Sequence, residues 1–183
     1  MRVVGGVLTG GASSRMGGAP KGLLVTPDGE PVVVRAVRVL REAGVTPVLV
    51  GRSDAYDVDA DRVADAPDVR GPLAGLVALL ERHDGPVVTV ACDMPFFTAP
   101  LVRRLVEAPP ARAVAARPGG VWQPFFARWD AANVRADARA YASAGGRSLF
   151  GLLERLGAAE LPLSEVEAGL LVDWDAPGDV TRG

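Results

Sequence analysis

Lys21 is the only lysine among the chain's 20 basic residues, and it ends a glycine-rich segment that begins at Gly10. A chain that otherwise uses arginine would keep a lysine where it needs a compact ammonium group, which a planar guanidinium cannot imitate. The segment follows the hydrophobic run 3–8 and contains Arg15. Glycines let backbone N–H groups approach phosphate oxygens, and lysine adds a point charge. This pattern predicts a phosphate-binding loop, and the alternative is a surface loop with a solvated lysine.

Asp93 lies at a second position suited to phosphate chemistry. It follows residues 86–91, which are apolar at nearly every position and predict a strand buried on both faces of a parallel sheet. Because ligands of open α/β sheets gather at the carboxyl ends of the strands, we expect Asp93 beside the phosphate-binding segment. Asp93 could instead cap the next helix, but Thr98 is better placed as that cap.

A carboxylate beside a phosphate chain indicates a divalent cation between them. Mg²⁺ fits, because it is usually held by one or two carboxylates together with water and substrate phosphates. We expect Asp93 as the first ligand and Asp175 or Asp173 as the second. The latter two follow an apolar segment, residues 170–172, that predicts a strand ending at the same edge. An ordinary turn is the alternative, since Asp-x-x-Pro is typical of turns.

Three further residues could contact substrates. Asp65 lies in a turn-rich segment before a predicted helix, where its carboxylate could accept hydrogen bonds from a ribose or a base. Gly71 in the same segment would allow close approach of a ligand to the backbone. Arg147 follows two glycines and could bind a second anionic substrate, because a guanidinium suits phosphate oxygens. The alternative for Arg147 is an arginine in solvent at the start of a helix.

Composition narrows the class of protein. The chain has 183 residues, 49% of them hydrophobic, which is enough for one domain with a substantial core. Its net charge of −2 gives no support for binding nucleic acid or an anionic membrane. No apolar run approaches the roughly 18 residues of a transmembrane helix. The first residues lead directly into a strand pattern without a leader sequence, so we expect a cytoplasmic protein.

The chain has one cysteine and one histidine, which limits other chemistries. Cys92 alone excludes an internal disulfide and disfavours a cysteine-based zinc site, and we expect it to be a small buried residue. A Ser-His-Asp hydrolase would have to use His83, whose sequence context is a helix end and a turn. We expect the aromatic residues Trp122, Trp129, Phe125 and Phe126 in the core rather than as a stacking platform.

Short apolar strand patterns alternate with helical patterns along the chain. This alternation predicts an open, mostly parallel sheet in a three-layer α/β arrangement, formed by a single domain over residues 1–183. The least regular part, residues 111–146, is expected at its periphery. The expected strands are residues 3–8, 45–50, 86–91, 111–116, 122–126 and 170–172. The expected helices are residues 31–43, 73–81, 98–107, 130–142 and 146–156.

Together these residues resemble the molybdenum cofactor guanylyltransferases, the MobA-like nucleotidyltransferases. The glycine-rich motif of that family is matched by Leu8-Thr9-Gly10-Gly11-Ala12-Ser13-Ser14-Arg15-Met16-Gly17, followed by Lys21. Further motifs of the family are matched in order by residues 71–75, 93–96, 123–124, 145–149 and 173–177. The resemblance therefore runs through nearly the whole chain.

The resemblance implies a Rossmann-like nucleotidyltransferase fold that binds GTP and Mg²⁺. The implied reaction joins GMP to the molybdopterin form of molybdenum cofactor and releases diphosphate, and a molybdoenzyme or a cofactor-delivery protein is an implied partner. By matching position, Lys21, Asp93 and Arg15 would be catalytic, Asp93 and Asp175 would bind the metal, and Arg147 would bind the pterin. The implied nucleotide-binding residues are Leu8, Thr9, Gly10, Gly11, Gly18, Lys21, Gly51, Asp65, Gly71 and Asp93.

The implied reaction needs no general base, because the attacking phosphate of the acceptor is already anionic. Catalysis would then consist of positioning the substrates and neutralising their charge. Lys21 would neutralise phosphate charge, the backbone amides of residues 10–18 would hold the phosphate chain, and Asp93 would hold the cation.

Two departures from the family pattern leave alternatives open. The family often has aspartate where Pro20 stands and asparagine where Gly51 stands. The alternatives are a cytidylyltransferase for the same pterin or another phosphate acceptor, and a non-catalytic protein that binds nucleotide or pterin. Gly11 favours guanine by resemblance, and the presence of both Lys21 and Asp93 favours an enzyme. A dehydrogenase is disfavoured because no Gly-x-Gly-x-x-Gly follows the first strand, and a P-loop kinase because Gly22 follows the lysine.

Overall fold

The computed structural model describes residues 2–9, 20–52 and 54–174 of the 183-residue chain. Its strands form one seven-stranded sheet in the order β3-β2-β1-β4-β6-β5-β7. All neighbouring strands are parallel except β6, which runs antiparallel to both β4 and β5. The strands are β1 Val4–Leu8, β2 Thr46–Val50, β3 Asp61–Val63, β4 Pro86–Ala91, β5 Ala113–Ala116, β6 Phe126–Asp130 and β7 Ala159–Leu161.

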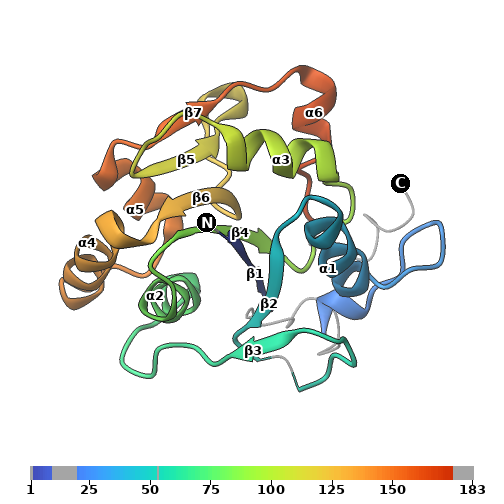
Figure 1. The fold of residues 1–183 in the computed structure, drawn as a ribbon, viewed down its shortest axis with the longest axis horizontal. Helices are drawn as coiled ribbons and strands as arrows, with labels where there is room; N and C mark the ends of the chain where they lie inside the picture. Colours follow the sequence, from blue (N-terminus) through green and yellow to red (C-terminus); the bar gives the residue numbers. More distant parts are fainter. Residues whose placement is uncertain (1, 10–19, 53, 175–183) are drawn as a thin grey trace.

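Helices cover both faces of this sheet (Figure 1). On one face lie α1 Val32–Glu42 and α3 Ala99–Glu107, with the short α6 Glu165–Gly169 beside α3. The other face carries α2 Pro72–Arg82, α4 Ala131–Ser143 and α5 Leu149–Leu156. Two short 3₁₀ turns complete the described elements, η2 Lys21–Leu23 and η3 Pro118–Gly120. The expected three-layer, mostly parallel α/β fold is therefore confirmed.

Glycines in the central strand β1 let helices from both faces pack closely on it. A Cβ atom on Gly5 would lie 2.7 Å from Cγ1 of Val45 and 3.0 Å from the methyl groups of Leu40 in α1. A Cβ atom on Gly6 would lie 2.7 Å from Cδ2 of Leu79 in α2. Because no side chain fits at these positions without displacing a neighbour, α1 and α2 pack closely on β1 from its two faces.

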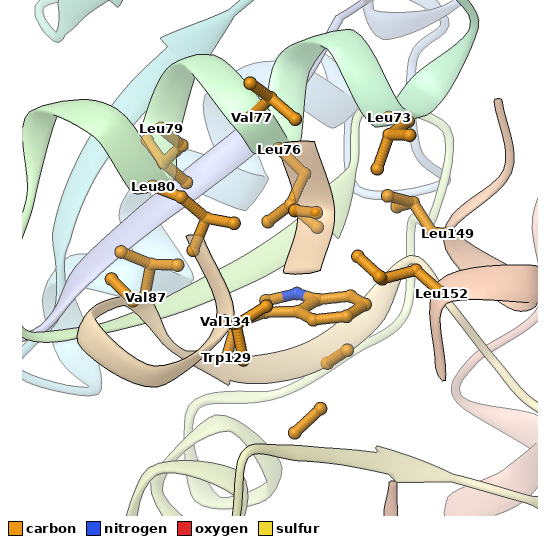
Figure 2. Close-up of a cluster of buried hydrophobic side chains, with 14 of the residues drawn as sticks. Leu73, Leu76, Val77, Leu79, Leu80, Val87, Trp129, Val134, Leu149 and Leu152 are labelled. Atoms are coloured by element: carbon orange, nitrogen blue, oxygen red, sulfur yellow. The ribbon is translucent and has the colours of Figure 1, made fainter. Parts of the chain in front are cut away.

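The core on the α2 face is built around Trp129 (Figure 2). Its indole is fully buried among side chains of α2, α4 and α5, and its Nε1–H donates to the hydroxyl of Thr89 at 2.9 Å. The polar edge of the ring is thereby satisfied inside an apolar layer. Trp122 and Phe126 are also buried, and Phe125 is partly buried against both cores, so the expected core position is confirmed for three of the four aromatic residues and in part for Phe125.

The expected strand at residues 122–126 is wrong in position, because the strand starts at Phe126 and ends at Asp130. Pro124 lacks an N–H and lies in the turn before the strand. The buried Arg128 hid the strand pattern, because it places a charge within an apolar run. Its guanidinium donates to the carbonyl oxygens of Val106, Ala108 and Pro109 at the end of α3, at 2.6–2.8 Å.

The expected late strand at residues 170–172 is also wrong, because this segment forms a turn after α6. The last strand of the sheet is β7, whose sequence Ala-Glu-Leu is too short and too polar to predict a strand. The edge strand β3 was missed for the same reason, since only Val63 of its three residues is buried. Helix α6 was missed as well, although Ser164 and Glu167 form a capping box at its start.

The remaining expected helices are present with small shifts of their ends. The helix expected from residue 146 begins at Leu149, after Ser148, whose hydroxyl accepts a hydrogen bond from the Gly151 N–H. Thr98 occupies the cap position of α3, as expected, but its side chain makes no capping hydrogen bond. No helix among the described residues is long and apolar enough to cross a membrane.

Candidate active site

The carboxyl ends of β1, β2 and β4 meet at one edge of the sheet. Thr9 follows β1 directly, and both its N–H and its hydroxyl donate to the carbonyl oxygen of Val50 at 2.8 Å. The N–H of Cys92 donates to the carbonyl oxygen of Leu8 at 3.2 Å. β1 pairs with β2 on one side and with β4 on the other. The order of the strands in the sheet therefore reverses its direction at β1. Such a point forms a crevice in open α/β sheets, and it is where ligands bind.

Lys21 and Asp93 come together at this edge. The Lys21 ammonium lies 3.0 Å from Oδ2 of Asp93, across 72 positions of sequence. Both side chains are mostly buried, with 20% and 17% of their surface exposed. The structure therefore brings together the two residues that the sequence singled out for phosphate and metal binding.

Tyr56 contacts the residues next to this pair, and the sequence did not indicate it. The Gly22 N–H donates to the Tyr56 hydroxyl at 3.4 Å, and that hydroxyl lies 3.9 Å from Sγ of Cys92. Tyr56 thus contacts the residue that follows Lys21 and the residue that precedes Asp93. Tyr56 is buried, with 3% of its surface exposed, and burial raises the pKa of its hydroxyl. The only sequence signal was an aromatic residue in a polar loop, which does not indicate a role by itself.

Cys92 is buried, which confirms the expectation of a structural residue. Burial raises the pKa of its thiol to about 11, and the neighbouring Asp93 carboxylate acts in the same direction. A thiol with so high a pKa carries almost no thiolate at neutral pH, so Cys92 is unsuited to act as a nucleophile.

The C-terminal segment reaches the site through a backbone contact rather than through a strand. The Trp174 N–H donates to the carbonyl oxygen of Asp93 at 2.9 Å. The buried Trp174 ring packs edge-on against Phe96, with ring centroids 5.7 Å apart at 85°. Asp173 therefore lies next to a residue bonded to Asp93, although the strand expected to carry it there is absent. The described residues contain no group of three or more His, Cys, Asp or Glu side chains that could hold a metal.

Asp65 lies at the same edge, after β3. A Cβ atom on Gly75 would lie 3.3 Å from Oδ1 of Asp65 and 3.1 Å from Cδ2 of Leu8. Partial burial of the carboxyl raises the pKa of Asp65, and the positive charge of Arg52 opposes this rise. Although Asp65 as a residue is exposed, its carboxyl lies against α2, where a hydrogen-bond donor of a ligand would favour its ionised form. The Gly51 N–H donates to the Val63 carbonyl at 2.9 Å, so only other atoms of Gly51 can face a ligand.

Gly71 and Arg147 are in close backbone contact at the start of α2. The Leu73 N–H donates to the Arg147 carbonyl at 3.2 Å, and a Cβ atom on Gly71 would lie only 2.8 Å from the same oxygen. Gly71 also has φ +70°, a conformation that favours glycine. The next turn is packed on Tyr141, whose ring lies 2.5 Å from where a Cβ atom on Gly146 would be. The backbone of Arg147 is therefore held at the start of α2, and its side chain is exposed.

Several predicted site residues are not among those that the structure describes, namely Gly10, Gly11, Arg15, Gly18 and Asp175. Their roles remain predictions. His83 lies at the opposite end of α2 from Gly71, away from the Lys21–Asp93 pair, which agrees with its expected role outside the chemistry. Burial, and to a lesser extent Arg82, lowers the pKa of its imidazole.

Comparison with known proteins places the chain among nucleotidyltransferases. Residues 5–159 match a family described as the MobA-like NTP transferase domain. A molybdenum cofactor guanylyltransferase of Pseudomonas putida strain F1 is 40% identical over 172 residues, which span 90% of this chain and 88% of that protein. A protein of the same name from Ralstonia nicotianae is 34% identical over 91% of this chain and 89% of its own.

Solved structures agree with the fold. The molybdopterin-guanine dinucleotide biosynthesis protein A of Archaeoglobus fulgidus superimposes with a TM-score of 0.79, covering 100% of this chain and 96% of its own. Its sequence identity of 24% is evidence for the fold alone. The matched residues 5–159 include all of β1 except Val4, the Lys21–Asp93 pair and the Gly71–Arg147 contact. From the extent of this match and from the relatives at 34–40% identity, the chain belongs to the MobA-like NTP transferase family.

Proposed function

We propose that this protein is a molybdenum cofactor guanylyltransferase, which transfers GMP from GTP to the phosphate of molybdopterin-bound molybdenum cofactor and releases diphosphate. The observation that carries the proposal is the Lys21–Asp93 pair, 3.0 Å apart, at the carboxyl edge of a sheet whose relatives carry this name. One residue of the pair suits phosphate oxygens and the other suits a cation.

The donor set at this edge fits Mg²⁺. Asp93 supplies a carboxylate, and Asp173 is brought beside it by the contact between Trp174 and the Asp93 carbonyl. Asp175, the second expected ligand, follows two residues later in the chain. One or two carboxylates are what Mg²⁺ requires when water and substrate phosphates complete its ligands. When bound, Mg²⁺ would supply Lewis-acid charge neutralisation at the phosphates.

The residues of the chain then have separate tasks. Lys21 contributes positive charge beside the phosphates, and its partial burial strengthens that interaction relative to water. Asp93 holds its position through the Lys21 ammonium and the neighbouring backbone contact, so the carboxylate is oriented before substrates bind. Asp65, Gly51 and Gly71 line the same edge, where they would contact the nucleoside.

The chemistry requires an in-line exchange at the α-phosphorus of GTP. The acceptor phosphate forms the new P–O bond, the bond to diphosphate breaks, and no proton needs to be removed from the nucleophile. This agrees with a site whose described residues provide charge and shape. Cys92 is protonated at neutral pH and His83 lies away from the site, so neither is needed as a base.

We further propose that residues 1–183 form a single nucleotidyltransferase domain, since all described strands belong to one sheet. GTP is a cytoplasmic substrate, so the proposal places the reaction in the cytoplasm. A molybdoenzyme or a delivery protein would receive the product.

Calorimetric titration of GTP, CTP and ATP, each with and without Mg²⁺, tests the proposal before any assay with the pterin. Guanylyltransferase function requires that GTP binds more tightly than the other two and that Mg²⁺ strengthens its binding. Tighter binding of CTP would instead assign a cytidylyltransferase. Failure of all three nucleotides to bind, in the presence and absence of the pterin, would favour a non-catalytic pterin-binding protein.

A further inference from the structure

The arginines whose guanidinium groups lack a hydrogen bond or ion pair to other described residues are unevenly distributed. Most arginines are paired with carboxylates or carbonyl oxygens, as Arg38, Arg104 and Arg139 are. Four have no such partner among the residues that the structure describes, and two more, Arg82 and Arg117, bond only within their own turns. The four are Arg52, Arg70, Arg147 and Arg155.

Four of these six arginines lie at the carboxyl edge of the sheet. Arg52 follows β2, Arg70 precedes α2, Arg147 precedes α5 and Arg117 directly follows β5. Arg155, in the last turn of α5, and Arg82, in the last turn of α2, lie elsewhere. Carboxylates share this edge, since Asp65 and Asp93 lie there, and the positive charge of Arg52 acts on Asp65. A guanidinium group without a carboxylate partner among the described residues is suited to an anionic ligand.

Arg117 is the one among these arginines whose side chain is held in a fixed position. Its guanidinium carbon lies 4.8 Å from the centroid of the Trp122 ring, and its Nε–H donates to the Gly120 carbonyl at 3.0 Å. The turn that returns the chain to Trp122 depends on Gly119 and Gly120, which have φ of +60° and +83°. Nε is occupied, so the two terminal nitrogens are left to bind a ligand.

Trp122 is itself anchored, so the stacked guanidinium does not rest on a mobile ring. The indole is 7% exposed, and its Nε1–H donates to the carboxylate of Glu154 on α5. Glu154 lies one helical turn after Phe150, whose side chain is 43% exposed near the start of the same helix. Arg147 precedes that helix. The Arg117–Trp122 stack is therefore connected through α5 to the start of the helix where Arg147 lies.

Exposed apolar groups accompany the two arginines. Val121 is 61% exposed directly before Trp122, and Phe150 is 43% exposed three residues after Arg147. The other described residues with exposed large apolar side chains are Leu23, Val25, Val166 and Val172. Exposed apolar side chains between guanidinium groups suit a flat heterocycle that carries an anionic group.

We propose that Arg117 binds the anionic group of the acceptor substrate, on the β5 side of the carboxyl edge, with Phe150 and Val121 beside its ring system. This inference rests on the proposed guanylyltransferase function and adds a substrate-binding residue that no motif of the family had indicated. In the proposed function the nucleotide lies along the carboxyl ends of β1, β2 and β4, and β6 separates β4 from β5. Arg117 therefore acts on the acceptor and not on GTP.

The test is steady-state guanylyl transfer with GTP and molybdenum cofactor, measured for the wild type, Arg117→Ala and Arg117→Lys. Loss of a charge-assisted contact predicts that Arg117→Ala raises the acceptor KM about tenfold. The KM for GTP stays within about twofold, since a nucleotide at the β1–β4 edge does not contact Arg117. Arg117→Lys keeps a positive charge and loses the planar fork, so its acceptor KM lies between the other two values.

Arg155→Ala is the matched control, because it removes another unpaired guanidinium at the far end of α5. Both of its KM values are expected to equal those of the wild type. An unchanged acceptor KM in Arg117→Ala, or equal rises of both KM values in Arg117→Ala and Arg117→Lys, overturns this inference alone. A wild-type protein that binds GTP but transfers no GMP overturns the proposed function, and this inference with it.

Discussion

Gly22 lies against the ring of Tyr56, and a Cβ atom on that glycine would come within 2.8 Å of Cε1 of the ring. The same Cβ would lie 3.0 Å from Cβ of Val33 in α1, so it could not escape by a small rotation. Since Lys21 is the neighbouring residue, the backbone turn that carries the ammonium is fixed by this contact. The position of Lys21 therefore depends on Gly22, which has no side chain, and on Tyr56, which the sequence did not indicate as a site residue.

Gly22→Ala is expected to lower kcat/KM for guanylyl transfer by about tenfold or more, because a displacement of about 1 Å at a positioned group is enough to do so. The variant should still fold, since the turn lies at the edge of the core. Gly169→Ala is the matched control, because a Cβ there has no neighbour within 4 Å and the residue ends helix α6. Equal activity of the two variants would show that the Gly22–Tyr56 contact does not position Lys21.

Substitution of Lys21 tests whether its charge contributes to catalysis rather than to the stability of the fold. Lys21→Ala should reduce kcat by about 10²-fold or more, the scale seen when an electrostatic contact to a transition state is lost. It should also weaken GTP binding without unfolding the protein.

Asp93→Asn removes the carboxylate but keeps the shape of the side chain, and it is expected to abolish both activity and the effect of Mg²⁺ on GTP affinity. Retained Mg²⁺ dependence in Asp93→Asn would exclude Asp93 as the metal ligand.

Much of the fold could be predicted because its main strands and helices carry strong patterns. The apolar run before Asp93 and the helical spacing of Leu73, Leu76, Val77 and Leu80 gave β4 and α2 within one or two residues. Errors fell where tertiary contacts override local pattern. β6 contains the buried Arg128, and β3 and β7 are short strands toward the two sides of the sheet, so their sequences carry almost no strand signal.

The candidate site was predictable at Lys21 and Asp93 because motif residues carry their chemistry in their type. Its supports were not predictable. Tyr56 acts through a long-range contact with Gly22, and Trp174 approaches Asp93 through a backbone bond that needs no particular residue type. Neither contact leaves a periodic trace in the sequence, so only the folded arrangement reveals it.

Gly71→Ala tests whether the α2 loop holds Arg147 in place. Alanine at φ +70° is strained, and its Cβ would also meet the Arg147 carbonyl at 2.8 Å. We expect a loss of about 1–3 kcal/mol in the free energy of unfolding and a higher KM for the acceptor. Gly145→Ala is the matched control, since Gly145 has φ +89° but no neighbour within 4 Å of its Cβ. It should lose stability by strain alone. Denaturant titration of both variants measures the loss of stability from backbone strain, and the acceptor KM measures the displacement of Arg147. Equal acceptor KM values in the two variants would contradict a contact between Arg147 and the acceptor.

The thiol of Cys92 predicts a specific loss of stability at alkaline pH. Its pKa in the folded protein is about 11, above the ordinary value of 9.0, because burial disfavours the thiolate. As pH rises, the unfolded chain therefore loses its proton first, and the stabilising contribution is complete below about 9 and lost between about 9 and 11. In Cys92→Ser the hydroxyl does not titrate in this range, so the free energy of unfolding should fall less between pH 8.5 and 10.5.

Alkylation by iodoacetamide tests the same thiol by an independent measurement. Since Cys92 is the only cysteine, each modified molecule reports that one side chain. The native protein at pH 8 should react several orders of magnitude more slowly than the chain in guanidinium chloride, because both burial and the raised pKa suppress the thiolate. Rapid modification of the native protein at pH 8 would contradict the buried position of Cys92. It would also mean that the wall of the site between Tyr56 and Asp93 opens to solvent.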